Sequence, residues 1–410
     1  MKKIIICLLL PFTAAGQSNI LTMEAAVQTA LQQNKGLQSA ATQVDYYRQL
    51  VRSSAEIPKT DVSLQYGQYN SYAKNDNNFS ITQAIPFPAV FGAKRQLNEA
   101  QVEKAQWYKA TTQNELVYQV KQSYLQLLFL KEQRQLLLRQ DSLFAAFAKS
   151  ADLRYRTGES RMLEKTAAEA RLNEVRNLLK QNEADNKIYA ARLQSLLGGE
   201  AGFTLSEVAL PAVKPAQLAD SAAVSSNPYL QYLKQQIAIS QKQKRVYSTA
   251  ILPDFTVGYF NQSLIGTALN ASGTPLATGS NRFQGFNIGV ALPLVWGPMK
   301  AKVKAEEKQV QAASLSYDNN LIQLQSQYQQ AVQQYVKQLA NLEYYHATAL
   351  PNAELILKQS LMAYGSGEIG YAEHFLNLEQ VLGIRQGYLQ TLHDAKQAEY
   401  FIAYLAGRQL

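Results

Sequence analysis

Cysteine is almost absent from this 410-residue chain. The single one, Cys7, lies in a short apolar run that follows a basic start and ends in small residues before Gln17. This succession is typical of a secretory signal peptide, which we expect to span residues 1–16. The mature chain would then have no cysteine, which excludes disulfides, thiolate metal sites and a cysteine nucleophile.

Long apolar runs and blocks of like charge are also missing. No stretch of about twenty apolar residues follows the N-terminal run, so no transmembrane helix is predicted, although short alternating membrane strands remain compatible with the sequence. The chain has 40 Lys and Arg against 31 Asp and Glu, interspersed with Gln and Ala. Such dispersed charge is typical of solvated helix faces, and nucleic-acid binding is not predicted.

Residue sets that carry chemistry are scarce. We recognise no nucleophile–base set, no carboxylate pair at a fixed spacing and no phosphate-binding loop, so the sequence predicts neither an enzyme nor a cofactor. The three histidines, His346, His374 and His393, are isolated and show no His-x-x-x-His spacing. We therefore predict no metal site.

What the chain does contain is a long internal repeat. The pentapeptide Tyr155–Glu159 returns as Tyr364–Glu368, and in each copy an acid, Glu164 or Glu373, follows six residues after the Tyr-x-x-Gly glycine. Further landmarks recur in the same order: residues 34–37 as 227–230, 57–59 as 252–254, and 84–87 as 291–294. The repeat is far longer than a solenoid unit of about 20–50 residues, which indicates duplication of a whole half-protein.

Each half is predicted to contain a helix, two strands joined by a polar loop, and two long helices joined at the Tyr-x-x-Gly turn. Period-two alternation indicates strands at about 60–70, 78–87, 254–262 and 282–293. The expected helices are Met23 to about Ala55, Gly92 to about Ala151, Arg154 to Leu197, Gln217 to Ile251, Met299 to Leu350 and Asn352 to Ala406. Helices of such length are typical of coiled coils.

The predicted organisation follows from these elements. After the signal peptide (residues 1–16) we expect a first repeat at 17–198, a linker at 199–216 and a second repeat at 217–410. The fold class is mainly α with membrane β-strands. Four strands in lipid would leave two open edges, where each unpaired backbone group costs several kcal/mol. Because the smallest single-chain membrane barrels have about eight strands, the chain is expected to oligomerise.

The signal peptide, the duplicated helix–strand–strand–helix unit, the prolines at the strand borders and the paired Tyr-x-x-Gly turns resemble the TolC family of outer-membrane efflux channels. The resemblance covers essentially the whole mature chain. It implies a homotrimer in which each chain gives four strands to one twelve-stranded barrel in the outer membrane of a Gram-negative bacterium. The long helices would form an α-barrel across the periplasm, with an equatorial segment near residues 199–215.

The resemblance also implies partners. The channel would pass substrates without chemistry from an inner-membrane pump, expected to be of the RND type, and a periplasmic adaptor. Drug efflux, metal-cation efflux and type I secretion are all compatible with it, and the outer-membrane lipid would surround the strands. Two alternatives remain open on the sequence: a non-channel coiled-coil envelope protein, and a periplasmic adaptor, which also has long helical hairpins.

Site residues follow from the same resemblance. It implies that Glu373 and Glu164 lie near the constricted channel entrance, where three copies of a carboxylate would form a ring that favours cations. Tyr364 and Glu164 match family gate positions and are expected to hydrogen-bond across the two hairpins. A second family acid is replaced by Leu376 and a family arginine by Ile369.

The two turns are the expected contact points for the adaptor. The candidates are Tyr155, Gly158, Tyr364 and Gly367. Each glycine can also be explained locally, because a tight turn between helices requires a positive φ. The second copy carries additional glycines, Gly365 and Gly370, and we expect its hairpin to be the more mobile one.

Overall fold

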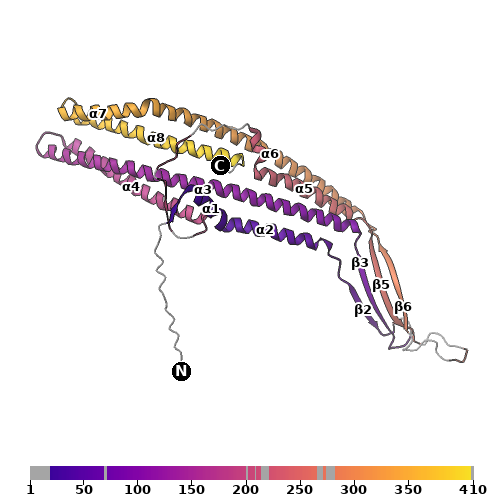
Figure 1. Cartoon of the computed structure of the whole chain (residues 1–410). Coiled ribbons are helices and arrows are strands. Elements are labelled where there is room, and N and C mark those ends of the chain that lie inside the picture. The colour runs from indigo at the N-terminus through magenta and orange to yellow at the C-terminus, as the bar shows by residue number, and fades with distance from the viewer. Residues whose placement is uncertain are drawn as a thin grey trace, which may run out of the picture. The chain divides into compact units, whose positions relative to one another are not determined.

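The computed structural model describes residues 19–68, 72–199, 202–207, 209–213, 221–265, 271–273 and 282–407. The predicted signal peptide lies outside these ranges, as does part of the predicted linker. The chain divides into two compact units. We call Met1–Gln38, Gln113–Ala223 and Ser326–Leu410 the hairpin unit, and Ser39–Thr112 and Val224–Gln325 the sheet unit. Figure 1 shows the elements that make up each of them.

The sheet unit is built around four antiparallel strands in the order β2-β3-β5-β6. These are β2 (Asp61–Tyr66), β3 (Asn77–Ile85), β5 (Asp254–Ser263) and β6 (Arg282–Ala291). The two repeats meet where β3 pairs with β5. All four strands coincide with the alternating stretches of the sequence. Among the described residues of one chain, β2 and β6 each pair with one strand only, so both edges of the sheet are open there.

The register separates the sheet into an apolar and a polar face. One row across the four strands is Val62, Ile81, Tyr259 and Phe286, and the next apolar residues along β6 are Ile288 and Val290. The adjacent rows on the other face carry mainly small and polar side chains, among them Ser63, Ser80, Thr82, Gly258 and Asn287, with Phe260 and Phe283 as the aromatic exceptions. Phe286 and Ile288 are about four-fifths exposed in the single chain. A sheet with one apolar and one polar face is typical of a membrane barrel wall.

Glycines on the polar face make room for cross-strand neighbours. A Cβ at Gly258 would collide with the Asn287 amide, and one at Gly289 would collide with Thr256 Oγ1. At Gly285 it would lie 2.8 Å from the Phe260 ring. Close approach of side chains from the next strand is a common reason for glycine inside a strand.

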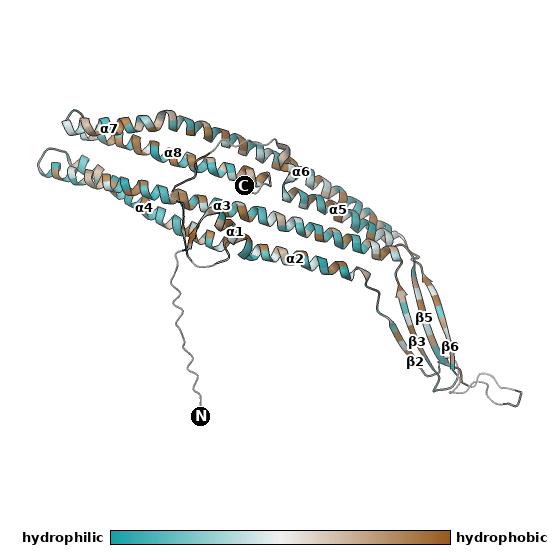
Figure 2. Cartoon of the chain, in the orientation of Figure 1, coloured by the Kyte–Doolittle hydropathy of each residue, from teal (hydrophilic) through white to brown (hydrophobic). Residues whose placement is uncertain are grey.

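Helices accompany the strands in the sheet unit. They are most of α2 (Lys35–Arg52), the 3₁₀ turn η1 (Ser53–Ala55), the second half of the 3₁₀ turn η2 (Ser221–Ser226), α5 (Pro228–Thr249), and the first parts of α3 (Pro88–Arg156) and α6 (Gly297–Tyr344). Asn98 of α3 donates its amide to Leu50 O and Ser54 Oγ, both at 2.9 Å. Lys244 of α5 pairs with Glu307 of α6 at 2.8 Å. Figure 2 shows apolar and polar residues intermixed along these helices.

The hairpin unit consists of two long helical hairpins and a short parallel sheet. The rest of α3 and α4 (Met162–Leu196) form one hairpin. The other combines the end of α6, the π-helical turn η3 (Tyr345–Ala349), α7 (Leu350–Ser366) and α8 (Tyr371–Leu405). Near them lie α1 (Met23–Gln33) and the paired strands β1 (Asn19–Leu21) and β4 (Phe203–Leu205).

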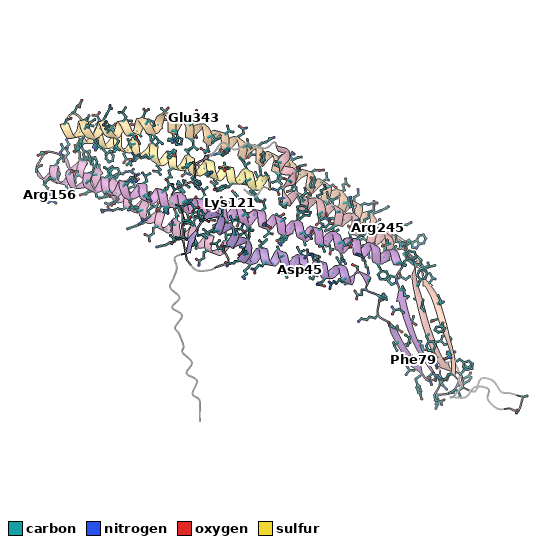
Figure 3. The ribbon with its side chains drawn as sticks, in the orientation of Figure 1. Asp45, Phe79, Lys121, Arg156, Arg245 and Glu343 are labelled. Atoms are coloured by element: carbon teal, nitrogen blue, oxygen red, sulfur yellow. The ribbon has the colours of Figure 1, made fainter. Side chains whose placement is uncertain are left out.

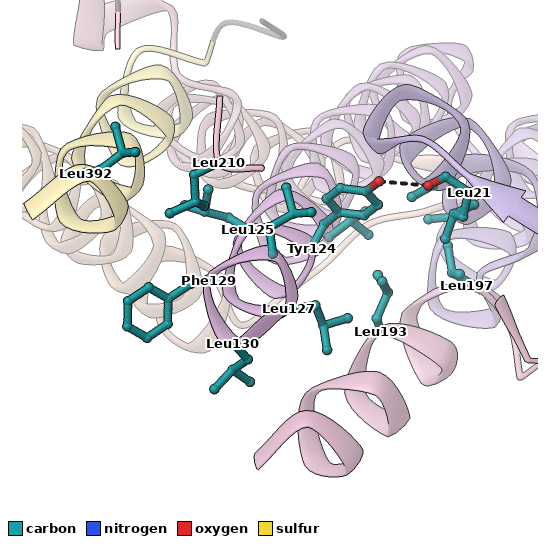
Figure 4. Packing of buried hydrophobic residues seen from close by; sticks show 14 of the residues in the cluster. Leu21, Tyr124, Leu125, Leu127, Phe129, Leu130, Leu193, Leu197, Leu210 and Leu392 are labelled. Carbon is teal, nitrogen blue, oxygen red and sulfur yellow. Dashed lines mark hydrogen bonds between the residues drawn. The ribbon is translucent and has the colours of Figure 1, made fainter. Parts of the chain in front are cut away.

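A leucine-rich core lies where β1 and α1 meet α3. Tyr124 of α3 is fully buried and donates its hydroxyl to Leu21 O at 2.7 Å (Figure 4). Leu125, Leu193 and Leu197 belong to the same cluster. Burial of each such side chain is worth about 1.5–3 kcal/mol. The core fixes β1 and β4 to the middle of α3.

Three helices predicted from the sequence have other boundaries in the structure. The expected single helix from Met23 to Ala55 is interrupted at Asn34, whose backbone is extended and whose side chain donates to Leu196 O. Gln217, the expected start of another helix, lies outside the described residues; within them α5 begins only at Pro228, where Asn227 caps it through its side-chain oxygen. In the first hairpin the second helix starts at Met162 and not at Arg154.

The break expected between Leu350 and Asn352 does not occur. The chain remains helical from α6 through η3 into α7, with Pro351 inside the helical stretch. Proline lacks an N–H, and its ring clashes with the carbonyl four residues earlier in a regular helix. The wider π-turn of η3 lies directly before Pro351, where it relieves that clash.

In the described part of the chain, no helix combines the length and the apolar character that crossing a membrane requires.

Candidate functional site

The two Tyr-x-x-Gly turns have the same backbone geometry. Gly158 has φ +80° and Gly367 has φ +79°. In the first turn Glu159 N donates to the carbonyl five residues back, Arg154 O, at 2.8 Å, and in the second Glu368 N makes the equivalent bond at 2.8 Å. This is a left-handed C-cap, in which glycine avoids the steric cost of a positive φ. The repeat in the sequence is therefore also a repeat in structure.

In both copies the residue seven positions after the glycine lies against the tyrosine of the motif. Lys165 Nζ is 5.5 Å from the centre of the Tyr155 ring. The His374 ring stacks on Tyr364 with centroids 4.7 Å apart and planes 8° apart. Lys165 also pairs with Asp152 at 2.7 Å, and this hydrogen bond lowers the pKa of Asp152 and raises that of Lys165. The first contact is charged, while the second is aromatic.

His374 is buried inside the second hairpin and is only 1% exposed. Its Nδ1 lies 2.6 Å from Ser360 Oγ, and its ring also stacks on Phe147 of α3 at 5.3 Å. Asn377 donates to the same Ser360 oxygen at 3.3 Å. Burial lowers the pKa of His374 because a charged imidazolium would lose its hydration.

The two candidate acids lie in different environments. Glu164 and Glu373 both occupy the first helical turn after their loops, where the positive end of the helix dipole favours a carboxylate. Glu164 is half-buried and lies close enough to Tyr371 to raise the pKa of that phenol, after burial and Tyr364, to about 12. Glu373 is exposed. Only Glu373 therefore presents its charge fully to solvent in the single chain.

Side chains from both hairpins form one core beneath the turns. Arg171 of α4 makes a bidentate ion pair with Glu379 of α8, with N–O distances of 2.7 and 2.8 Å. The fully buried Phe144 packs against Phe375 at 5.8 Å and lies below the Arg171 guanidinium at 5.5 Å. The contacts of Glu379 and Phe375 with the other hairpin join residues more than two hundred positions apart, and no spacing in the sequence points to them.

The structure brings some predicted site residues together and leaves others apart. Tyr155, Gly158 and Gly367 are exposed at the turns, and Figure 3 shows Arg156 beside the first of these turns. No hydrogen bond within the described ranges joins Tyr364 to Glu164, and the Tyr364 ring stacks on His374.

The remaining predicted positions have other surroundings. Leu376 is 67% exposed, and Ile369 N completes the second turn by donating to Ala363 O at 3.3 Å. The other two histidines lie apart from the turns and against aromatic rings, His346 on Tyr388 and His393 on Phe129.

Residues 26–199 match the family model described as outer membrane efflux protein. A search of the curated proteins gives no match. Among solved structures, the chain is similar to the outer-membrane channel OprN, with a TM-score of 0.79, 16% identity, and coverage of 94% of this chain and 90% of that one. For CusC, whose structures are described in terms of folding and transmembrane channel formation, the TM-score is 0.77 and the identity 15%, with coverage of 94% of this chain and 92% of CusC. For the Campylobacter jejuni CmeC outer membrane channel, the TM-score is 0.76 and the identity 14%, with coverage of 94% of this chain and 85% of that one.

Proposed function

We infer that the chain belongs to the outer membrane efflux protein family, because residues 26–199 match the family model and the fold is that of outer-membrane channels. From this premise we propose that it acts as a homotrimeric duct, which passively carries substrates from a periplasmic adaptor and an inner-membrane pump to the exterior. The family is one of channels and not of enzymes. The same family match favours the duct over a periplasmic adaptor or a non-channel envelope protein.

This proposal rests mainly on the sheet, which has one apolar and one polar face. Its apolar face is suited to lipid, and its polar face is suited to water. Its edges, β2 and β6, are open in the single chain. Because open edges are not tolerated in a hydrocarbon layer, β2 of one copy would pair with β6 of the next. Three copies of four strands give twelve, which lies within the range of known membrane barrels.

Cysteine pairs test this closure directly. Ser63→Cys in β2 is combined in turn with Phe283→Cys, Asn287→Cys or Ala291→Cys in β6, all on the same face of the sheet. We expect at least one pair to give a disulfide-linked trimer on a non-reducing gel. The control is Ser63→Cys with Thr256→Cys in the inner strand β5, which should give none. The absence of cross-links in all three pairs, in protein recovered from the outer membrane, would contradict the trimer.

The hairpin turns are the proposed contact points for the adaptor. Tyr155 and Gly158 in one turn, and Gly367 in the other, are solvent-exposed. Tyr364 is held by stacking on His374, so its role is to support the second turn from inside. The charged side chains of the first turn and the glycines of the second offer two different surfaces. An RND-type pump is the proposed energy source for this system.

The entrance is proposed to be negatively charged. In a trimer three copies of Glu373 would surround the axis, and the acid lies in the first turn of α8 with its side chain exposed. A ring of carboxylates in a narrow pore favours cations and repels anions. Glu164 is proposed to act less directly, because it is half-buried against Tyr371.

A further inference from the structure

An exposed apolar segment joins β6 to α6 in the sheet unit. It comprises residues 292–296, and Leu294, Val295 and Trp296 are 92%, 72% and 54% exposed. We call this segment with the first turns of α6 the β6–α6 passage. So many large apolar side chains in succession on a surface indicate contact with something other than water.

The passage continues the apolar face of the sheet. Along β6 that face is formed by Phe286, Ile288 and Val290, and the same every-second-residue succession reaches Leu292 and Leu294. In the first repeat, the short segment between β3 and α3 also contacts the apolar face, because Phe87 stacks on Phe255 with ring centroids 6.1 Å apart. The surface that faces lipid along the strands therefore extends to the start of the helices.

Cations follow the apolar residues in both passages. Lys300 lies over the Trp296 ring at 5.7 Å, and Lys302 lies over the Tyr247 ring of α5 at 5.8 Å. In the first repeat Lys94 and Arg95 follow Phe91 and Gly92 in the same order. Arg95 pairs with Glu99. No ion pair within the described ranges engages the exposed side chains of Lys300, Lys302 and Lys304.

The spacing of these groups matches the layers of a membrane. A strand of ten residues is about 33 Å long and, tilted by about 45°, covers roughly 23 Å of a hydrocarbon core of roughly 30 Å, so the core extends beyond β6 into the passage. Trp296 then falls at the boundary, where tryptophan is favoured. Lys300 lies about 6 Å further along a helix that rises 1.5 Å per residue, which is the depth of the headgroup layer. Lysine side chains also extend readily along apolar surface toward phosphate.

We propose that the β6–α6 passage binds the headgroup of an anionic phospholipid, with Lys300 and Lys304 contacting the phosphate and Trp296 packing on the upper acyl chain. The two lysines are four residues apart and share one face of α6. Their positive charge complements a lipid phosphate but not a neutral protein surface. This inference rests on the proposed membrane location of the sheet.

Native mass spectrometry of the full-length protein in detergent tests the proposal, with phosphatidylglycerol and phosphatidylcholine as probes. The wild type is expected to retain phosphatidylglycerol over phosphatidylcholine. The double variant Lys300→Gln/Lys304→Gln should retain less phosphatidylglycerol, by about fivefold for each charge removed. Lys300→Arg/Lys304→Arg, which keeps both charges, should restore most of it. Lys337→Gln, an exposed lysine further along α6, is the matched control and should change nothing.

Two results would overturn the proposal: equal retention of both lipids by the wild type, or an equal loss in Lys337→Gln. The conductance of the same preparations in a planar bilayer separates this inference from the proposed function. We expect the Lys300→Gln/Lys304→Gln variant to conduct as the wild type does. A wild type that retains phosphatidylglycerol but never conducts would contradict the duct and leave the lipid site standing. If the passage instead binds a neighbouring subunit, the double variant will lower the fraction of protein that is trimeric and leave lipid retention unchanged. That result would overturn the lipid site.

Discussion

The α3–α4 and α7–α8 hairpins share a backbone turn but differ in what supports it. Their glycines have φ values one degree apart, and the same five-residue hydrogen bond closes each loop. Against the motif tyrosine, however, one hairpin has the charged Lys165 and the other the buried His374. The turn geometry sets a narrow requirement that only glycine meets readily, while the contact on the tyrosine can be made by different chemistry.

The long helices that lead into the two turns, here called the shafts of the hairpins, differ as well. α3 runs without interruption for 69 residues. The other shaft contains the π-turn η3 and Pro351, and Tyr345 of that turn lies so close to Gly387 of α8 that a Cβ there would collide with its hydroxyl. A π-turn with a proline is a recognised cause of bending in a helix. We therefore expect the long helix of the first repeat to be stiff and that of the second to bend at η3.

The core shared by both hairpins should give the largest effect. Phe144→Ala removes a fully buried ring that packs between α8 and Arg171, so we expect a loss of about 3–5 kcal/mol in the free energy of unfolding. Thermal unfolding followed by circular dichroism measures it. Leu163→Ala, at a position 76% exposed, is the control and should be close to neutral. A loss in Phe144→Ala no larger than that in Leu163→Ala would contradict the stabilising role of this shared core.

The two turn glycines should be equally sensitive. Gly158→Ala and Gly367→Ala each place a side chain at a positive φ with no neighbouring atom within 4 Å, so the cost of about 1–2 kcal/mol is purely conformational. Gly370→Ala, at φ −78°, is the matched control and should cost much less. Chemical denaturation compares the three. Clearly unequal costs for Gly158→Ala and Gly367→Ala would break the equivalence of the turns.

Mild acid should weaken the second hairpin through His374. The folded state lowers the pKa of His374, so it favours the neutral ring, while the unfolded state binds a proton near the ordinary value of 6.5. The unfolded state thus gains protons first, and stability falls as the pH drops below about 6.5 and is regained above it. Thermal unfolding between pH 8 and pH 5 would record this.

The corresponding control is His374→Gln, which can still hydrogen-bond to Ser360 but does not titrate. Its stability should vary less over the same range than that of the wild type. Glu164, Tyr364 and Tyr371 are the titratable groups that surround this part of the hairpin. An identical pH profile for wild type and variant would assign the acid sensitivity to one of the other groups.

The smallest effect is expected on ion selectivity. Glu373→Ala should lower the preference of the channel for cations in a planar bilayer, because it removes an exposed charge from each copy. Glu164→Ala should lower it less, since that carboxylate is half-buried. Reversal potentials under a salt gradient give the comparison. Unchanged selectivity in Glu373→Ala would remove this residue from the entrance.

The sequence was sufficient for much of the fold. Alternation located all four strands, because residues such as Phe286 and Ile288 must share a face. Duplication related the two turns, since only glycine fits them readily. The continuous helix through Pro351 could not be predicted, because a local π-turn removes the clash that normally ends a helix at proline. The interruption at Asn34 depends on a distant acceptor, Leu196 O.

The site was less predictable than the fold. The positions of Tyr155, Gly158 and Gly367 at the turns followed from the motif. The hydrogen bond expected between Tyr364 and Glu164 did not anticipate the stacking of Tyr364 on His374. The ion pair of Arg171 with Glu379 joins the hairpins through tertiary packing, for which the sequence carries no periodic signal.

The native mass of the detergent-extracted protein tests the central claim most directly. A duct whose barrel closes only by adding strands from neighbouring copies requires three chains in one particle. We therefore predict a single species with three times the mass of the mature chain. A monodisperse monomer that still conducts ions in a planar bilayer would contradict the account.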